Sequence, residues 1–223
     1  MSVRKSFGVA VAAAVAVAAS PLSAQQLTGS NKWEGFYAGL NAGGLWQSTS
    51  ATIGENNTGG GFSGQGGGFV GGAQGGYNYL VGPVLIGGEI DFQGSTLTQS
   101  ITGGAGPSFI NATSAIPWFA TFRGRAGYTL GSFMPYVTGG AVWGHQSLSG
   151  TDSVGGAFSA SNNFWTWTVG GGVEGRINDQ WSAKLEYLYM GTPDTPLSTP
   201  ATTSISEHSV GNLVRVGLNY RFW

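Results

Sequence analysis

Ten charged side chains alternate with apolar residues along the chain, and their spacing indicates ion-pair chemistry. In "GGEIDFQG" (87–94) two carboxylates alternate with Ile90 and Phe92, and in "TFRGRAGY" (121–128) two guanidinium groups alternate with Phe122. Such alternation places the charges on one face of a β-strand. The full set is Glu89, Asp91, Arg123, Arg125, Glu174, Arg176, Lys184, Glu186, Arg215 and Arg221. If this face is enclosed, the charges must pair with one another, because an isolated buried ion is very unfavourable.

Hairpin geometry predicts which of these charges face each other. A turn centred on Asp179 places Glu174 directly opposite Lys184. A turn centred between positions 81 and 82 places Glu89 opposite Gln74. The strand with Arg123 and Arg125 follows the strand with the two carboxylates and is its neighbour in the sheet. We therefore expect both arginines to lie near Glu89 and Asp91. We therefore predict a lumen filled by a cross-braced network of charges.

A second group, His145, Ser147 and Asp152, contains the residue types of an activated nucleophile. A histidine that accepts the proton of a serine, and is itself oriented by a carboxylate, is the arrangement of many hydrolases. A histidine and a serine two positions apart also arise by chance in serine-rich sequence. We expect no catalytic residues.

Cofactor and metal motifs are weak in this sequence. The segment "GGGFVG" (66–71) matches G-x-G-x-x-G, but it precedes a predicted strand, whereas a dinucleotide site needs a preceding strand and a following helix. His145 and His208 could ligate haem or a metal, but they have no fixed spacing and read more simply as solvated loop residues. We expect no cofactor and no metal.

The composition excludes several classes of protein. Charged residues make up 9% of the 223 residues, against roughly 25% in soluble domains. The formal net charge of −1 offers no electrostatic footprint for nucleic acid. The chain has no cysteine, so disulfides and thiolate metal sites are excluded.

The first 24 residues have the pattern of a secretory signal peptide. Arg4 and Lys5 precede an apolar run from Phe7 to Ala19, and small residues follow up to Ala24. The run has 13 residues, fewer than the ~20 that a membrane-spanning helix needs. We therefore expect cleavage after residue 24 and a single mature domain over 25–223.

The mature chain reads as eight strands with connections of alternating length. The predicted strands are 34–46, 69–79, 84–94, 116–128, 135–145, 164–177, 181–190 and 209–222. The segments 47–68, 95–115, 146–163 and 191–208 are predicted to be long loops, and 80–83, 129–134 and 178–180 short turns. Eight antiparallel strands of ~10 residues, with long loops on one side only, are typical of a small transmembrane β-barrel.

The periodicity alone does not say which face of each strand contacts lipid, since a soluble barrel would turn its apolar face inward. Two observations favour the apolar face outward. The long loops hold only four charged residues, and aromatic residues gather near both ends of the strands. They are Tyr77, Tyr79, Tyr128, Trp181, Tyr220 and Phe222 at one end, and Trp118, Trp143, Trp165 and Trp167 at the other. Two aromatic belts around an apolar band are typical of bilayer-spanning barrels.

Several segments carry a resemblance to a known family: "WEGFYAGLNAGG" (33–44), "RGRAGY" (123–128), "GGGVEGRINDQWSAKLEYLY" (170–189) and "VRVGLNYRF" (214–222). The chain resembles the small outer-membrane β-barrels of alphaproteobacteria, the porin-like or immunogenic outer-membrane proteins, which are similar to OmpA-type barrels. The resemblance implies location in the Gram-negative outer membrane and insertion by the barrel-assembly machinery. It also implies an insertion signal in the last strand, here Tyr220, Phe222 and Trp223.

These observations together predict a structural or surface-interaction protein of the envelope. Expected partners are outer-membrane lipids, lipopolysaccharide and an extracellular ligand of the four long loops, but not nucleic acid. A narrow porin is one alternative, because the lumen carries ordered charges. A lipid A-modifying enzyme that uses His145 and Ser147 is another.

Overall fold

The computed structural model describes residues 30–54, 60–105, 108–152, 156–191 and 204–222, and almost all of them lie in β-strands. A short 3-10 helix, η1 (Ser30–Trp33), precedes eight strands: β1 (Gly35–Gly54), β2 (Gly60–Val81), β3 (Val84–Ala105), β4 (Ser108–Tyr128), β5 (Phe133–Asp152), β6 (Ala157–Arg176), β7 (Trp181–Gly191) and β8 (Ser204–Arg221). No helix in this described part of the chain is long and apolar enough to span a membrane. The predicted signal peptide, 1–24, lies outside the described residues, so its cleavage stays a prediction.

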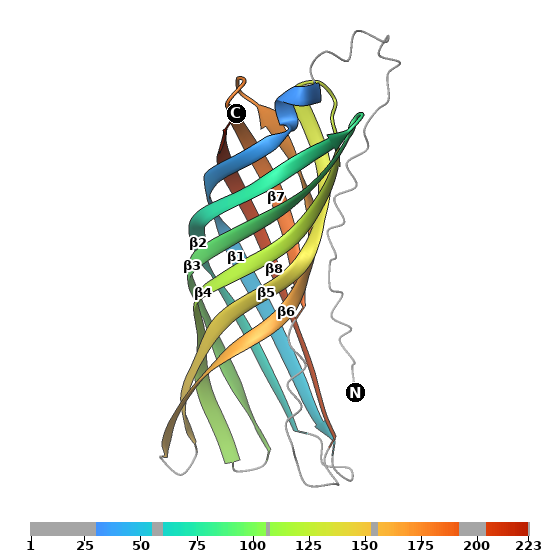
Figure 1. Cartoon of the computed structure of the whole chain (residues 1–223). Coiled ribbons are helices and arrows are strands. Elements are labelled where there is room, and N and C mark those ends of the chain that lie inside the picture. The colour runs from blue at the N-terminus through green and yellow to red at the C-terminus, as the bar shows by residue number, and fades with distance from the viewer. Residues whose placement is uncertain (1–29, 55–59, 106–107, 153–155, 192–203, 223) are drawn as a thin grey trace.

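The eight strands form one closed antiparallel barrel (Figure 1). Each strand pairs with the next, and β1 pairs with β8 to close the sheet. The predicted all-β, up-and-down architecture is therefore confirmed. The turns after β2, β4 and β6 lie at the same end of the barrel as η1 and the end of β8 (Figure 1). Gly82 and Gly131 supply the positive φ angles, 62° and 66°, in two of these turns.

Most strands extend far beyond the predicted boundaries, and the prediction of long loops over 47–68, 95–115 and 146–163 is wrong. Most of the fourth predicted loop, 191–208, lies outside the described residues. Most of 47–68, 95–115 and 146–163 continues the ladders, with pairs such as Ser50 with Ser63 and Gln99 with Ser114. Glycine and serine made these segments look like loops, but their backbone groups pair with neighbours that extend equally far. A register shift between Ala115 and Trp118 surrounds Pro117, which has no N–H for a ladder.

Two of the three predicted charge alignments are confirmed. Glu174 pairs with Lys184 across β6 and β7, and Glu89 lies directly opposite Arg123 across β3 and β4. The alignment of Glu89 with Gln74 is wrong, because Gln74 pairs with Asp91. The turn consists of residues 82 and 83 alone, so its centre lies one position later than predicted and every β2–β3 pair shifts by two residues.

The apolar face of each strand points outward, as predicted. Phe122, Leu185 and Val214 expose 41%, 56% and 37% of their surface, whereas Arg123 and Arg215 are buried inside. A chain with this distribution needs an apolar solvent around it, because a soluble protein rarely exposes a contiguous apolar patch of this extent.

The described interior contains three layers, and the ion pairs lie in the middle one. Toward the long strand extensions lies an apolar layer of Leu45, Val70, Leu97, Phe119, Val142, Leu188, Met190 and Leu213. Toward the short turns lies a second apolar layer of Trp33, Leu85, Met134 and Tyr136. The predicted network of charges therefore occupies the middle of the lumen and does not fill all of it, because the inward face of the strands also carries apolar residues on either side of the charges.

The close approach of β2 to β3 leaves no space for a side chain at Gly72. A Cβ atom there would lie 1.9 Å from the backbone oxygen of Phe92, whereas a Cβ on the adjacent Gly71 would lie 3.7 Å from its nearest contact. We predict that Gly72→Ala lowers the free energy of unfolding by about 1–3 kcal/mol through overpacking. Gly71→Ala should change it by less than about 0.5 kcal/mol. Urea titration of both variants in lipid vesicles measures the difference, and equal stabilities would contradict the prediction.

Candidate functional site

The charges gather in one cluster in the middle of the barrel, and this cluster is the candidate site. The luminal charge cluster consists of Glu89 and Asp91 on β3, Arg123 and Arg125 on β4, Glu174 on β6, Lys184 and Glu186 on β7, and Arg215 on β8. Every member is at most 4% exposed. Four carboxylates and four basic groups give the cluster a formal charge of zero.

Glu89 is the centre of the cluster. Its carboxylate accepts hydrogen bonds from Lys184 Nζ at 2.7 and 2.8 Å, from the Tyr37 hydroxyl at 2.7 Å and from Arg123 Nη2. Arg125 Nη1 lies 3.4 Å away on the same carboxylate. Arg215 Nη2 lies 3.5 Å from it as well. Cations from β4, β7 and β8 therefore satisfy both oxygens of one buried acid, which is the condition under which a buried charge is tolerated.

Two arginines from opposite sides of the barrel bridge two further carboxylates, those of Asp91 and Glu186. Arg123 reaches Asp91 at 2.8 Å and Glu186 at 3.0 Å. Arg215 reaches the same two acids, Asp91 at 3.0 Å and Glu186 at 2.7 Å. The Thr121 hydroxyl donates to Asp91 at 2.7 Å. The planar guanidinium groups thus connect β3, β4, β7 and β8 across the lumen in a way that single lysines could not.

Glu174 extends the cluster toward the short turns. Its carboxylate accepts from Arg125 Nη2 at 2.6 Å, from the Ser182 hydroxyl at 2.6 Å and from Asn219 at 3.1 Å. Arg221, also among the predicted residues, lies 3.9 Å from the same carboxylate. Its side chain is held instead by the backbone carbonyl of Lys32, to which it donates.

Arg176, the last predicted member, lies outside the ion-pair network. Its guanidinium stands 5.6 Å from the Trp33 ring, and that of Arg221 stands 5.2 Å from the same ring. No carboxylate among the described residues forms an ion pair with Arg176. The two arginines therefore position the indole that closes this end of the lumen, through cation–π contacts.

An exposed ion pair fixes η1 from outside the membrane-spanning strands. Lys32 Nζ donates to Asp179 in the β6–β7 turn at 2.6 Å. This hydrogen bond, and then the charge of Lys32, lower the pKa of the Asp179 carboxyl below its usual value. The contact therefore favours the docked helix above the ordinary pKa of an aspartate and is lost as the pH falls through the lowered value.

The structure does not bring together His145, Ser147 and Asp152, the group on which the enzyme alternative depends. His145 lies beside Trp118, on which its ring stacks, and its Nδ1 contacts Asn163 Oδ1 at 2.8 Å. Asp152 lies on the same strand seven residues farther along, which at ~3.3 Å per residue is roughly 23 Å away. Residues this far apart on one extended strand cannot converge, so the arrangement that the enzyme alternative requires is not formed.

The other histidine does not join His145. His208 lies on β8, where it pairs with Ser50 of β1, whereas His145 lies on β5. No group of three or more metal-ligating side chains occurs among the residues that the structure describes. The segment 66–71 lies inside β2, a continuous strand, so it does not open a helix as a dinucleotide site requires.

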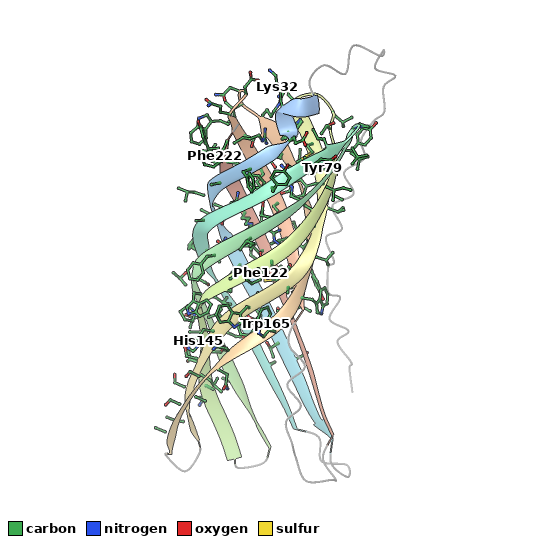
Figure 2. The ribbon with its side chains drawn as sticks, viewed as in Figure 1. Lys32, Tyr79, Phe122, His145, Trp165 and Phe222 are labelled. Atoms are coloured by element: carbon green, nitrogen blue, oxygen red, sulfur yellow. The ribbon has the colours of Figure 1, made fainter. Side chains whose placement is uncertain are left out.

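Two aromatic belts surround the outside of the barrel (Figure 2). Near the short turns, the Tyr220 ring lies 5.2 Å from those of Trp181 and Phe222. Farther along, Trp143 lies 5.1 Å from Trp118 and 6.1 Å from Trp165. Figure 2 shows Tyr79 and Phe222 near one end and Phe122, Trp165 and His145 well away from it. On β4 the belts lie ten residues apart, from Trp118 to Tyr128, which suits the 9–11 residues of a bilayer-spanning strand.

Tyr220 and Phe222, two of the three residues of the predicted insertion signal, lie on the outer face at the end of β8. Phe222 is half exposed, and its N–H donates to the backbone of Phe36 at 2.9 Å. Tyr220 accepts a hydrogen bond from Gln180 through its hydroxyl. Trp223 lies outside the described residues.

The sequence prediction missed the uncharged side chains that complete the cluster. Tyr37 and Tyr136 donate to Glu89 and Glu186 at 2.7 and 2.9 Å. Trp33 was also missed, although its indole closes the lumen. Tyr37 has the parity of Asn41, a polar residue in a predicted strand, and this signal could have placed it inside.

Arg123 binds three of the four acids, so its loss should be severe. We predict that Arg123→Ala lowers the free energy of unfolding by about 3–5 kcal/mol, because it leaves buried carboxylates without their cation. Lys32→Ala, which removes an exposed pair, is the control and should leave the stability nearly unchanged. Unfolding in urea, followed by tryptophan fluorescence in lipid vesicles, measures both. Wild-type stability of Arg123→Ala would contradict the role of the cluster.

Similarity to known proteins assigns this barrel to a family. The family model described as "Outer membrane protein beta-barrel domain" matches residues 9–222. The 31 kDa outer-membrane immunogenic protein of Brucella melitensis is 36% identical over 204 residues, covering 85% of this chain and 84% of that protein. The 22 kDa outer membrane protein of Rhizobium leguminosarum bv. viciae is 27% identical and covers 85% and 78%.

Among solved structures, Ail of Yersinia pestis is 13% identical with a TM-score of 0.42, covering 85% of this chain and 99% of that one. The outer membrane protease OmpT of Escherichia coli is 11% identical with a TM-score of 0.46, covering 84% and 96%. These scores carry no information about what this chain does. The family model and the curated relatives do establish the family: the chain belongs to the outer membrane protein β-barrel domain family and is an outer-membrane protein.

Proposed function

We propose that this protein is a sealed barrel that strengthens the outer membrane and presents a surface for contacts outside the cell. The observation that carries the proposal is the closure of the lumen on both sides of the luminal charge cluster. Leu188, Leu213 and Phe119 lie on its outer side and Trp33 on its inner side, each at most 2% exposed. An eight-stranded barrel is just wide enough for its side chains to fill it.

The narrow porin is the less favoured alternative. A permeating ion would have to cross an apolar layer and then a neutral cluster whose charges already bind one another. Selective pores instead line a hydrated path with charges or carbonyl groups. The buried ion pairs favour a mechanical role, because they connect β3, β4, β6, β7 and β8 across the interior.

An enzymatic role has little support. The relatives are named as immunogenic outer-membrane proteins, and His145 contacts an asparagine rather than a serine or a carboxylate. We therefore propose a non-enzymatic protein.

The surface for outside contacts is formed by the strand extensions beyond the second aromatic belt. On β4 the extension runs from Trp118 back to Ser108, which at ~3.3 Å per residue is about 33 Å. Past this belt the sequence has Glu55, Asp152, Asp194 and Glu207 but no lysine or arginine. The relatives' immunogenic designation supports exposure of the corresponding surface. Of the loop segments first proposed for this role, 55–59, 106–107, 153–155 and 192–203 lie outside the described residues.

The membrane partners follow from the same arrangement. We propose that the apolar outer face contacts lipid acyl chains and that lipopolysaccharide surrounds the belt of Trp118, Trp143 and Trp165. We also propose that the barrel-assembly machinery recognises the outer face of β8, where Tyr220 and Phe222 stack.

Conductance measurements test the sealed barrel. We predict that the purified, folded protein produces no discrete current steps in planar lipid bilayers, because the apolar layers exclude hydrated ions. A general porin reconstituted in parallel is the positive control, and heat-dependent gel mobility verifies that the barrel is folded. Reproducible single-channel steps from the folded protein would favour the porin.

A further inference from the structure

The wall of the barrel carries a polar hollow beyond the second aromatic belt, on the extensions of β3, β4 and β5, which lie side by side in the sheet (Figure 1). Its volume is about 450 Å³, within the range of about 300–1,000 Å³ for clefts that hold small ligands. The polar side chains that line it all end in a hydroxyl or an amide and are all exposed: Ser100, Thr102, Asn111, Thr113, Ser149 and Thr151. Each of the three strands supplies two of them.

The strand register places these six side chains in two rows. Ser100 pairs with Thr113, which pairs with Ser149 on its other side. The second row lies two residues farther from the membrane and consists of Thr102, Asn111 and Thr151. Neighbours within a row have Cβ atoms about 4.5–5.5 Å apart, and the two rows are about 7 Å apart. The hollow therefore presents a regular grid of six hydrogen-bonding groups on a continuous sheet.

The alternation along β4 shows that the hollow opens on the outside of the barrel. Ala112 and Ser114 alternate with the two lining residues of this strand and are only 8% and 3% exposed, so they lie on the inner face. On that inner face Ser114 also accepts a hydrogen bond from Gln146 of β5 at 2.8 Å. Asn111 and Thr113 have the opposite parity and are exposed. The hollow therefore faces the molecules that stand beside the barrel, not its lumen.

The height of the hollow above the membrane selects among those molecules. Asn111 and Thr113 lie seven and five residues beyond Trp118 on β4, which is roughly 17–23 Å along the strand. At a strand tilt of about 35–45° they stand about 12–19 Å above the tryptophan. The headgroup layer outside the hydrocarbon is only about 5–8 Å thick, so the hollow lies beyond it. In an outer membrane, the sugars of lipopolysaccharide occupy this level.

The sequence around the hollow favours a neutral ligand over an anionic one. The segments that contain the lining residues, 95–117 and 144–152, have no lysine and no arginine. Asp152 is their one acidic residue. Phosphate groups and acidic sugars are typically held by guanidinium or ammonium groups, and these segments supply neither.

Hydroxyl and amide side chains match the hydrogen-bonding groups of a neutral sugar. A serine or threonine hydroxyl donates one hydrogen bond and accepts two, and an asparagine amide presents two donors beside an acceptor. Sugar hydroxyls have the same dual character, so each can donate to one side chain while it accepts from another. The three threonines of the hollow also carry a methyl group beside each hydroxyl, which can contact the C–H groups of a sugar ring.

We propose that this hollow binds neutral sugar residues of the lipopolysaccharide that surrounds the barrel. The contact holds the barrel to the sugar layer through hydrogen bonds, without ion pairs or a bridging cation. A soluble glycan is a less suitable occupant, because the hollow opens sideways from the wall into the membrane's own sugar layer. The inference deepens the proposed contact with lipopolysaccharide and rests on the proposed role as a surface for outside contacts.

Binding of delipidated lipopolysaccharide tests the proposal. The probe is the polysaccharide that mild acid releases from the lipopolysaccharide of the bacterium that makes this protein, labelled with a dye. We expect saturable binding to the folded barrel in phosphocholine micelles, measured by fluorescence anisotropy. The affinity should be the same in about 0.5 M NaCl, which screens ion pairs, and in EDTA, which removes bridging cations. Thr113→Val removes one hydroxyl and keeps the branched shape of the side chain, so it should weaken binding about fivefold.

Thr98→Val is the matched control, because Thr98 is exposed on the same face of β3 but does not line the hollow. It should bind as the wild type does, and heat-modifiable mobility verifies that both variants fold. The proposal is overturned by any of three results: no saturable binding, equal affinities of Thr113→Val and the wild type or of the two variants, or binding that salt or EDTA abolishes. Saturable binding of a neutral dextran but not of the polysaccharide would overturn it in favour of a soluble glycan.

This inference and the proposed function fail separately. Single-channel steps from a barrel that still binds the polysaccharide would refute the sealed lumen alone. A silent barrel that binds no polysaccharide would refute the sugar site and leave the sealed lumen in place.

Discussion

The absence of hydrogen-bond partners in hydrocarbon is the constraint on which the rest of the structure depends. Every backbone group between the aromatic belts must pair within the wall, so β1 joins β8 and the sheet closes. Closure then separates an outside that contacts acyl chains from an inside that does not. The alternation of each strand assigns its side chains to one or the other, with Leu185 outside and Lys184 inside.

The same constraint explains why the charges form one compact network. Within the membrane the interior is the only place for them, and it contains too little space for water to solvate each one separately. Four acids and four bases therefore neutralise one another, with tyrosine and threonine hydroxyls completing the coordination of Glu89 and Asp91. Apolar layers above and below exclude the water that would weaken these pairs.

The features that could be predicted from the sequence are those that depend only on the alternation of residues along a strand or on the position of the turn in a single hairpin. The outward face of β8 and the pairing of Glu174 with Lys184 needed only alternation and a turn position. The Glu89–Gln74 alignment failed because a one-position error in the turn moves every pair by two. The strand extensions were missed because they are rich in glycine and serine, which are typical of loops. They are strands because the backbone of each extension pairs with a neighbouring extension, and one segment of sequence does not reveal that neighbour. The luminal Leu188 and Leu213 were missed because the inward parity was treated as uniformly polar.

The contact between η1 and the last strand links the two distant parts of the chain that meet at the inner mouth. Arg221 holds the carbonyl of Lys32, and its guanidinium lies over Trp33. The part of the Trp33 environment that Arg221 supplies therefore exists only after β8 has joined the sheet, so closure of the barrel completes the contacts that hold η1 at the inner mouth.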